Sequence, residues 1–249
     1  MDRHRDAAEL LLSARRDRSQ RLRAIPEAIR PKTAEQSYLI QREIMTQLGA
    51  IGGWKVGSPS ASAETFTCAP LPARGILNSP AEITGSDRGI EAEIAVRLGA
   101  DLPARDARYT EAELRGAIAS AHPAIEVLDS RFADPGAADP LSALADSLSH
   151  HSLVLGPPIP DWERLDIAAE SVRVLLDGRE VKHGAGNPAG GMVRLLLWLA
   201  NTGARWAGGL REGQVVTTGS WTGKDVAAPG EEARIRFDHC GEVSMRFMS

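Results

Sequence analysis

The chain has 249 residues, 43% of them hydrophobic and 25% charged, and its formal net charge at pH 7 is −4. This composition is typical of a globular protein with room for one large domain or two small ones, and its acidic balance disfavours a nucleic-acid-binding surface. The sequence has no run of about 18 apolar residues, which a membrane-spanning helix needs, and its early basic residues are interleaved with acids, unlike those of a transit peptide. The two cysteines have no zinc-ligand spacing and form no disulfide framework, so we expect a cytoplasmic protein with incidental thiols.

Helices dominate the first part of the chain. In chain order, the elements expected there are a helix over 6–23, a helix over 33–49, a strand over 52–58, a loop-rich segment over 58–88, a strand over 90–98, a helix over 110–121, a strand over 123–130, a helix over 139–148 and a strand over 151–156. Two of these helices begin with a capping box, formed by Thr33 with Gln36 and by Thr110 with Glu113.

Strands dominate the rest of the chain. The elements expected there are a hairpin over 171–181, a helix over 188–203, a strand over 214–219 and a second hairpin over 232–247. The sequence shows no internal repeat and no linker. We therefore predict an α+β protein, rather than a βαβ series, with a single catalytic domain over 1–249 and a helical N-terminal portion at 1–50.

The strand at 90–98 carries two carboxylates on one face. Its apolar residues alternate without a break from Ile90 to Leu98, which is the period of a half-buried strand, and Glu91 and Glu93 point to the other side. Residues i and i+2 of a strand point the same way, roughly 6.5 Å apart, so both carboxylates can lean toward one point. On a helix the same spacing would turn them apart. Taken alone, such a pair is ordinarily a solvent-exposed face.

A third acid, Glu126, lies on an expected strand that is apolar on both faces. A buried carboxylate is costly unless it pairs with a cation or binds a metal. Two explanations are therefore open: an internal ion pair with Arg131 or another cation, or a site in which three carboxylates bind Mg²⁺ or Mn²⁺ rather than Zn²⁺. Lys55 is either a lysine at a strand edge or a pocket ammonium that binds a carboxylate or moves a proton.

Three other patterns are set aside. The glycine-rich segment 184–191 lacks the spacing of a dinucleotide-binding loop, and 218–223 is not the nucleophile elbow of a hydrolase. His150 and His151 are adjacent on an expected strand, so they point to opposite faces and cannot chelate one metal together.

The order of motifs along the chain resembles the fumarylacetoacetate hydrolase superfamily and, within it, the 2-keto-4-pentenoate hydratase / 4-oxalocrotonate decarboxylase branch. The motifs, which cover nearly the whole chain, are GWKVG, IEAEIAVRLGADLP, PAIEVLDSR, LADSLSHHSLVLG, HGAG, WLANTGARWAGGLREGQVVTTGS and PGEEARIRF. The resemblance implies a mixed β-roll with N-terminal helices, and a homo-oligomer.

The resemblance also implies a role for particular residues, with the metal bound in a β-rich core at 51–249. The residues concerned are Lys55 as the catalytic group, Glu91, Glu93 and Glu126 as ligands of Mg²⁺ or Mn²⁺, and Ser58, Ser149 and Thr218 as substrate-binding residues. Related enzymes bind a short 2-oxo or 2-hydroxydienoic acid, which chelates the metal and forms an enolate.

The sequence departs from this branch at three places. Asn78–Pro80 stands where hydratases usually have an acid, the usual D-N-A-S reads DSLS at 146–149, and the G-x-P before the late helix reads GGM at 190–192. The first hypothesis is a lyase that hydrates a 2-hydroxypenta-2,4-dienoate-like acid. The alternatives are decarboxylation of a 4-oxalocrotonate-like acid, a biosynthetic dehydration or cyclisation, hydrolysis of an acylpyruvate, and a non-catalytic scaffold subunit that binds a partner enzyme of its pathway.

Overall fold

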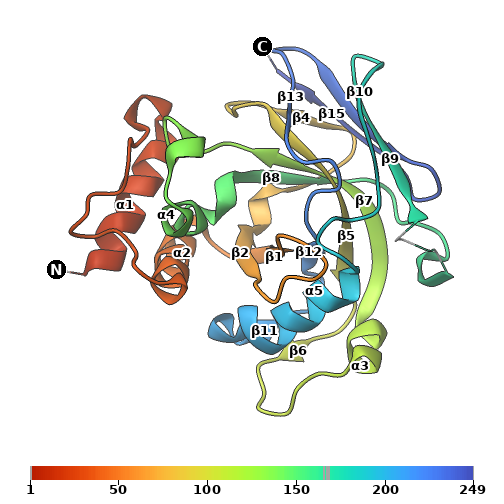
Figure 1. The fold of residues 1–249 in the computed structure, drawn as a ribbon, viewed down its shortest axis with the longest axis horizontal. Helices are drawn as coiled ribbons and strands as arrows, with labels where there is room; N and C mark the ends of the chain where they lie inside the picture. The colour runs from red at the N-terminus through yellow and green to blue at the C-terminus, as the bar shows by residue number, and fades with distance from the viewer. Residues whose placement is uncertain (1, 165, 167–168, 249) are drawn as a thin grey trace.

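The computed structural model describes residues 2–164, 166 and 169–248, which form two large β-sheets and a two-stranded one, β11-β6, with helices beside them (Figure 1). The α-helices are α1 (Arg3–Arg16), α2 (Ala34–Leu48), α3 (Glu111–Gly116), α4 (Pro140–Ala145) and α5 (Met192–Trp198). The strands before α4 are β1 (Ile51–Gly57), β2 (Thr67–Pro72), β3 (Ile76–Asn78), β4 (Ala81–Ile83), β5 (Gly89–Leu98), β6 (Leu102–Pro103) and β7 (Ile118–Leu128). The strands after α4 are β8 (His150–Leu155), β9 (Ser171–Leu176), β10 (Arg179–Ala185), β11 (Gly209–Leu210), β12 (Val215–Thr217), β13 (Asp225–Val226), β14 (Glu232–Phe237) and β15 (Gly241–Phe247).

The larger sheet has eight strands in the order β2-β1-β12-β5-β7-β8-β3, with β13 also paired to β5. The second sheet has five strands in the order β10-β9-β14-β15-β4. Apolar side chains of both sheets share one buried cluster, to which β5 contributes Ile94 and β14 contributes Ile235. The predicted α+β class is confirmed. Strand β5 is buried along both faces rather than one: its apolar face lies in the core that both sheets share, and on its other face Glu93 is buried beside Glu126.

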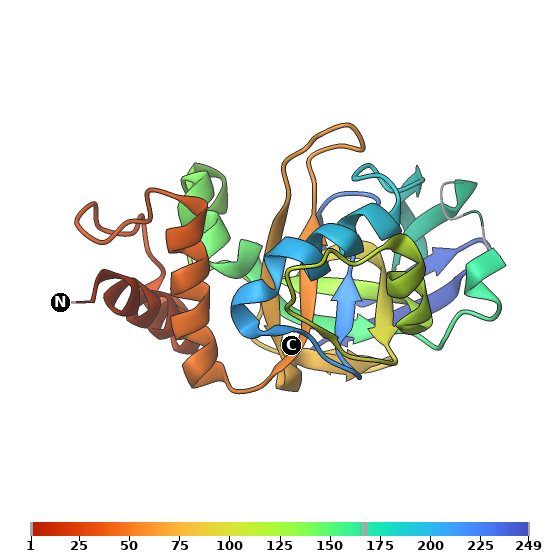
Figure 2. The same ribbon diagram turned by 90° about the horizontal axis from the view of Figure 1, so that it is seen from below.

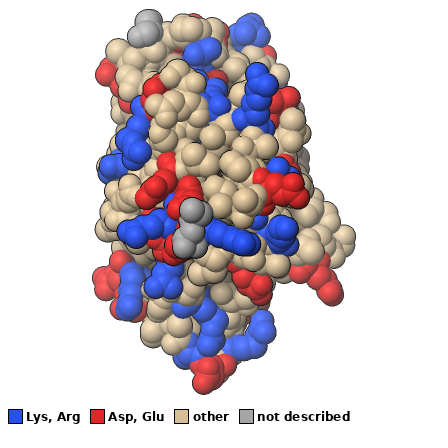
Figure 3. Space-filling model, turned by 90° about the vertical axis from the view of Figure 1, so that its left-hand side faces the viewer, with Lys and Arg blue, Asp and Glu red and all other residues tan. Residues whose placement is uncertain are grey.

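The N-terminal helices lie at one end of the molecule, where α1 packs against α2 and α2 packs against α4 (Figures 1 and 2). Their apolar faces form a separate buried cluster in which Leu11 and Ile40 meet Phe132 and Ala145. The segment between β7 and β8 is therefore held by the first helices of the chain. Figure 3 shows basic and acidic side chains intermingled on this end of the molecule.

Several helices end earlier than their sequence pattern predicts. Helix α1 ends at Arg16, because the side chain of Asp17 caps a new 3₁₀ turn. Helix α3 keeps its Thr110 capping box but ends at Gly116, and β7 begins at Ile118 where a helix to residue 121 was expected. Residues 118–121 pair with β5, and this tertiary pairing outweighs the helix propensity of the alanines.

The segment 58–88 contains three short strands, β2, β3 and β4, instead of the expected loops. Pro70 and Pro72 are compatible with β2, because β2 is the edge strand of the larger sheet, where a missing N–H costs no ladder hydrogen bond. The strand predicted over 90–98 is confirmed as β5, and the hairpin turn predicted at Asp177-Gly178 is confirmed between β9 and β10. Within the described residues, no helix is both long and apolar enough to cross a membrane.

Candidate active site

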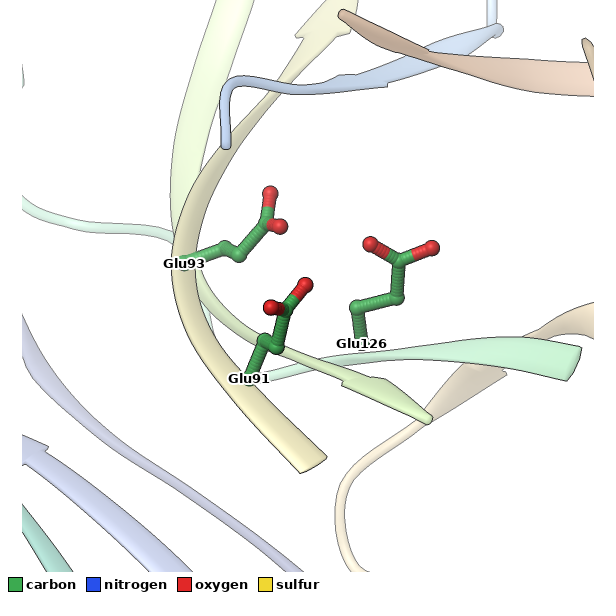
Figure 4. A group of neighbouring side chains, drawn as sticks. All are labelled: Glu91, Glu93 and Glu126. Atoms are coloured by element: carbon green, nitrogen blue, oxygen red, sulfur yellow. The ribbon is translucent and has the colours of Figure 1, made fainter. Parts of the chain in front are cut away.

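Three glutamates converge at the centre of the larger sheet. Strands β5 and β7 are antiparallel neighbours, and their register places Glu91 directly opposite Glu126. Glu93 follows two residues later on the same face of β5. One carboxylate oxygen from each glutamate lies within 4.8 Å of those of the other two, and Figure 4 shows the three groups pointing toward one another. The convergence expected from the sequence is therefore present in the fold.

The three carboxylates differ in their electrostatic surroundings. Burial, followed by repulsion from Glu126 and Glu91, raises the pKa of Glu93 well above its ordinary value. Burial and the charge of Glu126 also raise the pKa of Glu91. Burial alone would raise the pKa of Glu126 as well, but Lys55 and His150 lower it to about 2. Glu126 is thus the permanently ionised member of the cluster, and the other two glutamates gain most from an added cation.

Lys55 supplies the cation that pairs with Glu126. It lies on β1, and its Nζ donates to Glu126 Oε1 at 2.6 Å and to the carbonyl of Leu148 at 3.4 Å. Burial alone would lower the pKa of Lys55, but the three glutamates, Glu126 foremost, raise it, so Lys55 is an ammonium. Arg131, the alternative partner named from the sequence, instead forms a buried ion pair with Asp146.

His150 is a member of this cluster that sequence reasoning missed. Its Nδ1 lies 2.9 Å from Glu126 Oε1. Burial lowers the pKa of His150 to about 4 despite this contact, so the ring is neutral, and Nδ1 must carry the proton that the carboxylate accepts. The alternation that prevents His150 and His151 from sharing a metal also aims one of the two rings at Glu126. Considering each histidine separately, as a hydrogen-bond partner of one of the glutamates, would have identified His150.

The role of His150 can be tested by matched substitutions. His150→Ala removes a donor from Glu126 and is expected to lower Mg²⁺ affinity about tenfold, since groups that orient a metal ligand typically contribute 10- to 100-fold. His150→Asn keeps an N–H near the position of Nδ1 and should retain most of the affinity. Isothermal titration calorimetry measures the Mg²⁺ affinity of both variants. An affinity unchanged in His150→Ala would show that the contact with Glu126 does not contribute to metal binding.

A cavity of about 640 Å³ opens beside the glutamates. Two of the three predicted substrate-binding residues, Ser58 and Ser149, line it together with Lys55. Among the described residues Thr218 does not line it, and its hydroxyl donates to the carbonyl of Ile94 at 2.8 Å.

Thr217, the residue before Thr218, is hydrogen-bonded to the glutamate cluster. The Thr217 hydroxyl and the backbone N–H of Gly219 both donate to Glu93 Oε2. Because alternate residues of a strand point to opposite faces, only one of the two adjacent threonines can face Glu93. We expect Thr217 to orient Glu93, and the binding roles of Ser58, Ser149 and Thr218 remain predictions.

Two of the segments that depart from the hydratase motifs, 146–149 and 78–80, lie at different distances from the cavity. Ser147, Leu148 and Ser149 all have left-handed backbones, with φ of 52°, 52° and 65°. This strained turn brings the carbonyl of Leu148 to Lys55 and places Ser149 at the cavity. The segment 78–80, by contrast, lies outside the described residues that line the cavity, and Ser79 is hydrogen-bonded to the backbone of Ser244. The structure does not place 78–80 in the path of a substrate.

The residues present fit a divalent cation. Glu126 Oε2 is buried and, within the described part of the chain, has no hydrogen-bond partner. Within the described residues, Lys55 is the lysine that forms an ion pair with this cluster, so the three carboxylates, when all are ionised, carry two negative charges beyond that pair. All of the converging ligand atoms are carboxylate oxygens, which Mg²⁺ and Mn²⁺ prefer and which are less suited to Zn²⁺.

Residues 61–248 match the family model described as fumarylacetoacetate (FAA) hydrolase C-terminal. The chain belongs to the fumarylacetoacetate hydrolase family. The resemblance seen in its motifs is therefore confirmed, and the mixed β-roll expected from them is the fold of this family.

Individual members of the family resemble the chain over most of its length. It is 25% identical to 2-keto-4-pentenoate hydratase 1 of Dechloromonas aromatica, over 97% of this chain and 96% of the relative. It is 32% identical to 2-keto-4-pentenoate hydratase of Paraburkholderia phymatum, over 71% of this chain and 63% of the relative. The structure of 4-oxalocrotonate decarboxylase from Pseudomonas putida G7, complexed with magnesium and adipate, superposes with a TM-score of 0.84 at 25% identity, over 98% of this chain and 97% of that one.

The likeness to these fumarylacetoacetate hydrolase relatives includes the N-terminal helices. The family model begins at residue 61, after α1, α2 and β1, whereas the superposition with the decarboxylase covers 98% of the chain. The helical end of the molecule is therefore shared with this relative, beyond the conserved C-terminal family model.

Proposed function

We propose that this protein is a divalent-metal-dependent lyase that acts on a small 2-oxo or 2-hydroxydienoic acid, with hydration of a 2-hydroxypenta-2,4-dienoate-like acid as its reaction. The observation that carries the proposal is the convergence of Glu91, Glu93 and Glu126 beside a buried lysine, at a cavity of about 640 Å³. Relatives that match the chain over nearly their whole length are named hydratases, which supports the reaction class.

Glu91, Glu93 and Glu126 would hold Mg²⁺ or Mn²⁺. When bound, such an ion supplies a Lewis acid that polarises a 2-oxo group and lowers the free energy of enolisation. His150 orients Glu126 through its Nδ1–H, and Thr217 orients Glu93 through its hydroxyl. These two contacts keep the carboxylate oxygens directed at a common point.

Lys55 is the ammonium group in contact with the carboxylates. Two of its three N–H groups are directed at Glu126 Oε1 and the Leu148 carbonyl, so one N–H remains for a ligand in the cavity. That N–H would bind the substrate carboxylate or move a proton to the developing product. Ser58 and Ser149 would bind the same acid from the cavity wall. Thr218 would act indirectly, as the neighbour of Thr217, which contacts Glu93.

Decarboxylation of a 4-oxalocrotonate-like acid is the second candidate. It is favoured by the superposition with the decarboxylase at a TM-score of 0.84. Both reactions need a metal-polarised 2-oxo group, so the same residues would serve either one. Hydration adds one water to the dienoate and releases no CO₂, whereas decarboxylation releases CO₂, so a carbon dioxide assay separates them.

The proposal includes a cytoplasmic enzyme that forms a homo-oligomer. Cys68 and Cys240 are free and buried, which suits a reducing compartment. The oligomeric state is tested by analytical ultracentrifugation, and co-purification would reveal a partner enzyme of the same pathway.

Oxalate tests the metal site without requiring turnover. It can chelate through adjacent oxygens as a 2-oxo acid does, so in the presence of Mg²⁺ it should bind the native state and raise the melting temperature. With oxalate at a hundredfold excess over its Kd, we expect a rise of about 5 °C. The shift should vanish in EDTA, as differential scanning fluorimetry will show. A shift that survives EDTA would place oxalate away from the glutamates.

Turnover tests the reaction itself. Loss of the dienoate absorbance is measured with 2-hydroxypenta-2,4-dienoate and longer analogues, with Mg²⁺ and with EDTA. Metal-dependent loss of the chromophore without CO₂ supports hydration. The absence of turnover on every such acid would overturn the proposed reaction, while the oxalate experiment still reports on the metal site.

A further inference from the structure

A lysine that has no ion pair among the described residues lines the cavity. Lys224 lines the cavity but lies outside the glutamate cluster. Within the described residues, no ion pair or hydrogen bond involves its ammonium group, although its backbone carbonyl accepts from Lys182 Nζ at 3.4 Å. The backbone of Lys224 is further held by β13, whose first residue, Asp225, pairs with Ile90 of β5. A fixed backbone therefore presents an unpaired cation to the cavity.

The β5–β7 ladder gives the position of Lys224 relative to the metal ligands. Glu91 faces Glu126 on one rung, and Gly89 faces Leu128 two residues further along. A Cβ atom at Gly89 would lie only 2.9 Å from Lys224 Cε, so the side chain of Lys224 lies across this glycine. The side chain of Lys224 thus lies on the same face of β5 as Glu91, two residues or roughly 6.5 Å further along the strand.

The other charged groups at this end of the cavity are already paired. Asp87, which also lines the cavity, forms ion pairs with Arg18 and Arg21, and Arg21 pairs with Asp129 as well. Lys182, which donates to the backbone carbonyl of Lys224, pairs with Asp225 at 3.5 Å. Among the described residues that line the cavity, Lys224 is therefore a cation with no ion pair of its own, although its charge acts on Glu91 from a distance.

Between the glutamates and Lys224 the wall of the cavity is apolar. Leu128 lines the cavity on the rung that Lys224 crosses. An acid chelated at the glutamates and extended along the ladder would lay its carbon chain over Leu128 and bring its far end to Lys224. The order of charged, apolar and charged groups matches a linear acid with a carboxylate at each end.

Resting on the metal site of the proposed function, we propose that Lys224 binds a second carboxylate at the far end of the substrate, so that the site prefers a dicarboxylic 2-oxo acid to a monocarboxylic one of the same length. Of the two candidate substrates, this favours the 4-oxalocrotonate-like acid, which has two carboxylates, over the dienoate, which has one. Lys224 is then the residue that sets this specificity. Since its ammonium is exposed, the preference is modest and decreases with ionic strength.

Binding of two matched acids to the Mg²⁺-loaded full-length protein tests the proposal. The probes are 2-oxoadipate and 2-oxohexanoate, which have six carbons each and differ by the terminal carboxylate. In the wild type we expect 2-oxoadipate to bind about fivefold more tightly. Lys224→Gln should bring the two affinities within about twofold of each other, by weakening 2-oxoadipate alone.

Lys182→Gln is the matched control. Lys182 also acts electrostatically on Glu91, as Lys224 does, but it is not among the described residues that line the cavity. It should therefore keep the fivefold preference. Equal affinities in the wild type, a preference that survives in Lys224→Gln, or equal losses in both variants would each overturn the proposal.

Oxalate separates this inference from the proposed function. It is too short to reach Lys224, so its Mg²⁺-dependent affinity should be the same in the wild type and in Lys224→Gln. If oxalate binds with Mg²⁺ and the dicarboxylate preference is absent, only the role of Lys224 is wrong. If oxalate fails to bind the Mg²⁺-treated wild type, the metal site itself is wrong.

Discussion

Replacing Glu93 by glutamine is expected to lower Mg²⁺ affinity at least about 100-fold, because the change removes a ligand charge and exceeds the 10- to 100-fold effect typical of groups that only orient a ligand. The metal-free protein should be as stable as the wild type or more so. Burial and the neighbouring carboxylates raise the pKa of Glu93, so its ionised form is disfavoured in the fold, and a neutral amide relieves that repulsion.

The opposite signs of these two effects make the experiment decisive. Calorimetry measures the Mg²⁺ affinity, and chemical denaturation in EDTA measures the free energy of unfolding. Glu111→Gln is the control, because Glu111 is an exposed glutamate on α3. Equal Mg²⁺ binding in wild type and Glu93→Gln would show that the three glutamates are not the metal site.

Replacing Lys55 by methionine is expected to lower turnover by about 10² to 10⁴, the range for loss of a positioned acid or base. Mg²⁺ binding should be retained, since the change removes a positive charge from beside the ligands. The metal-free variant should lose stability, because buried Glu126 is left without its cation, and breaking a buried ion pair typically costs about 3–5 kcal/mol. Added Mg²⁺ should restore part of that loss by mass action.

Lys55→Arg separates charge from shape. A guanidinium keeps the positive charge beside Glu126 and should preserve stability, but it does not release its proton and its planar fork differs from an ammonium. We therefore expect turnover to fall in both variants and metal-free stability to fall mainly in Lys55→Met. Turnover is measured with the dienoate assay. Full activity in Lys55→Met would refute the role given to this lysine.

The carboxylate site could be read from local sequence pattern to a large extent. The alternation around Glu91 and Glu93 placed both on one face of a strand, and the apolar surroundings of Glu126 indicated a buried acid. Both depend on the two-residue period of a strand, which is a property of the local chain. The turn at Asp177-Gly178 was predictable for the same reason, because these residues tolerate the backbone that a tight hairpin requires.

Helix ends were less predictable than strand faces. The alanines after Gly116 favour a helix in isolation, yet residues 118–121 join the ladder with β5. The left-handed turn at 147–149 ends α4 early in the same way. In both places the packing of distant elements, which no local pattern contains, outweighs a helix propensity of a few tenths of a kcal/mol per residue.

The sequence by itself therefore determined the family of this protein, the strand that carries two glutamates and the need of the third for a partner. Only the tertiary structure decided that Lys55 rather than Arg131 is that partner, that His150 joins it, and that Thr217 rather than Thr218 contacts Glu93. The faces of a strand follow from its own period. Which side chains meet across strands depends on register and sheet order, and these are set by the burial of the whole core.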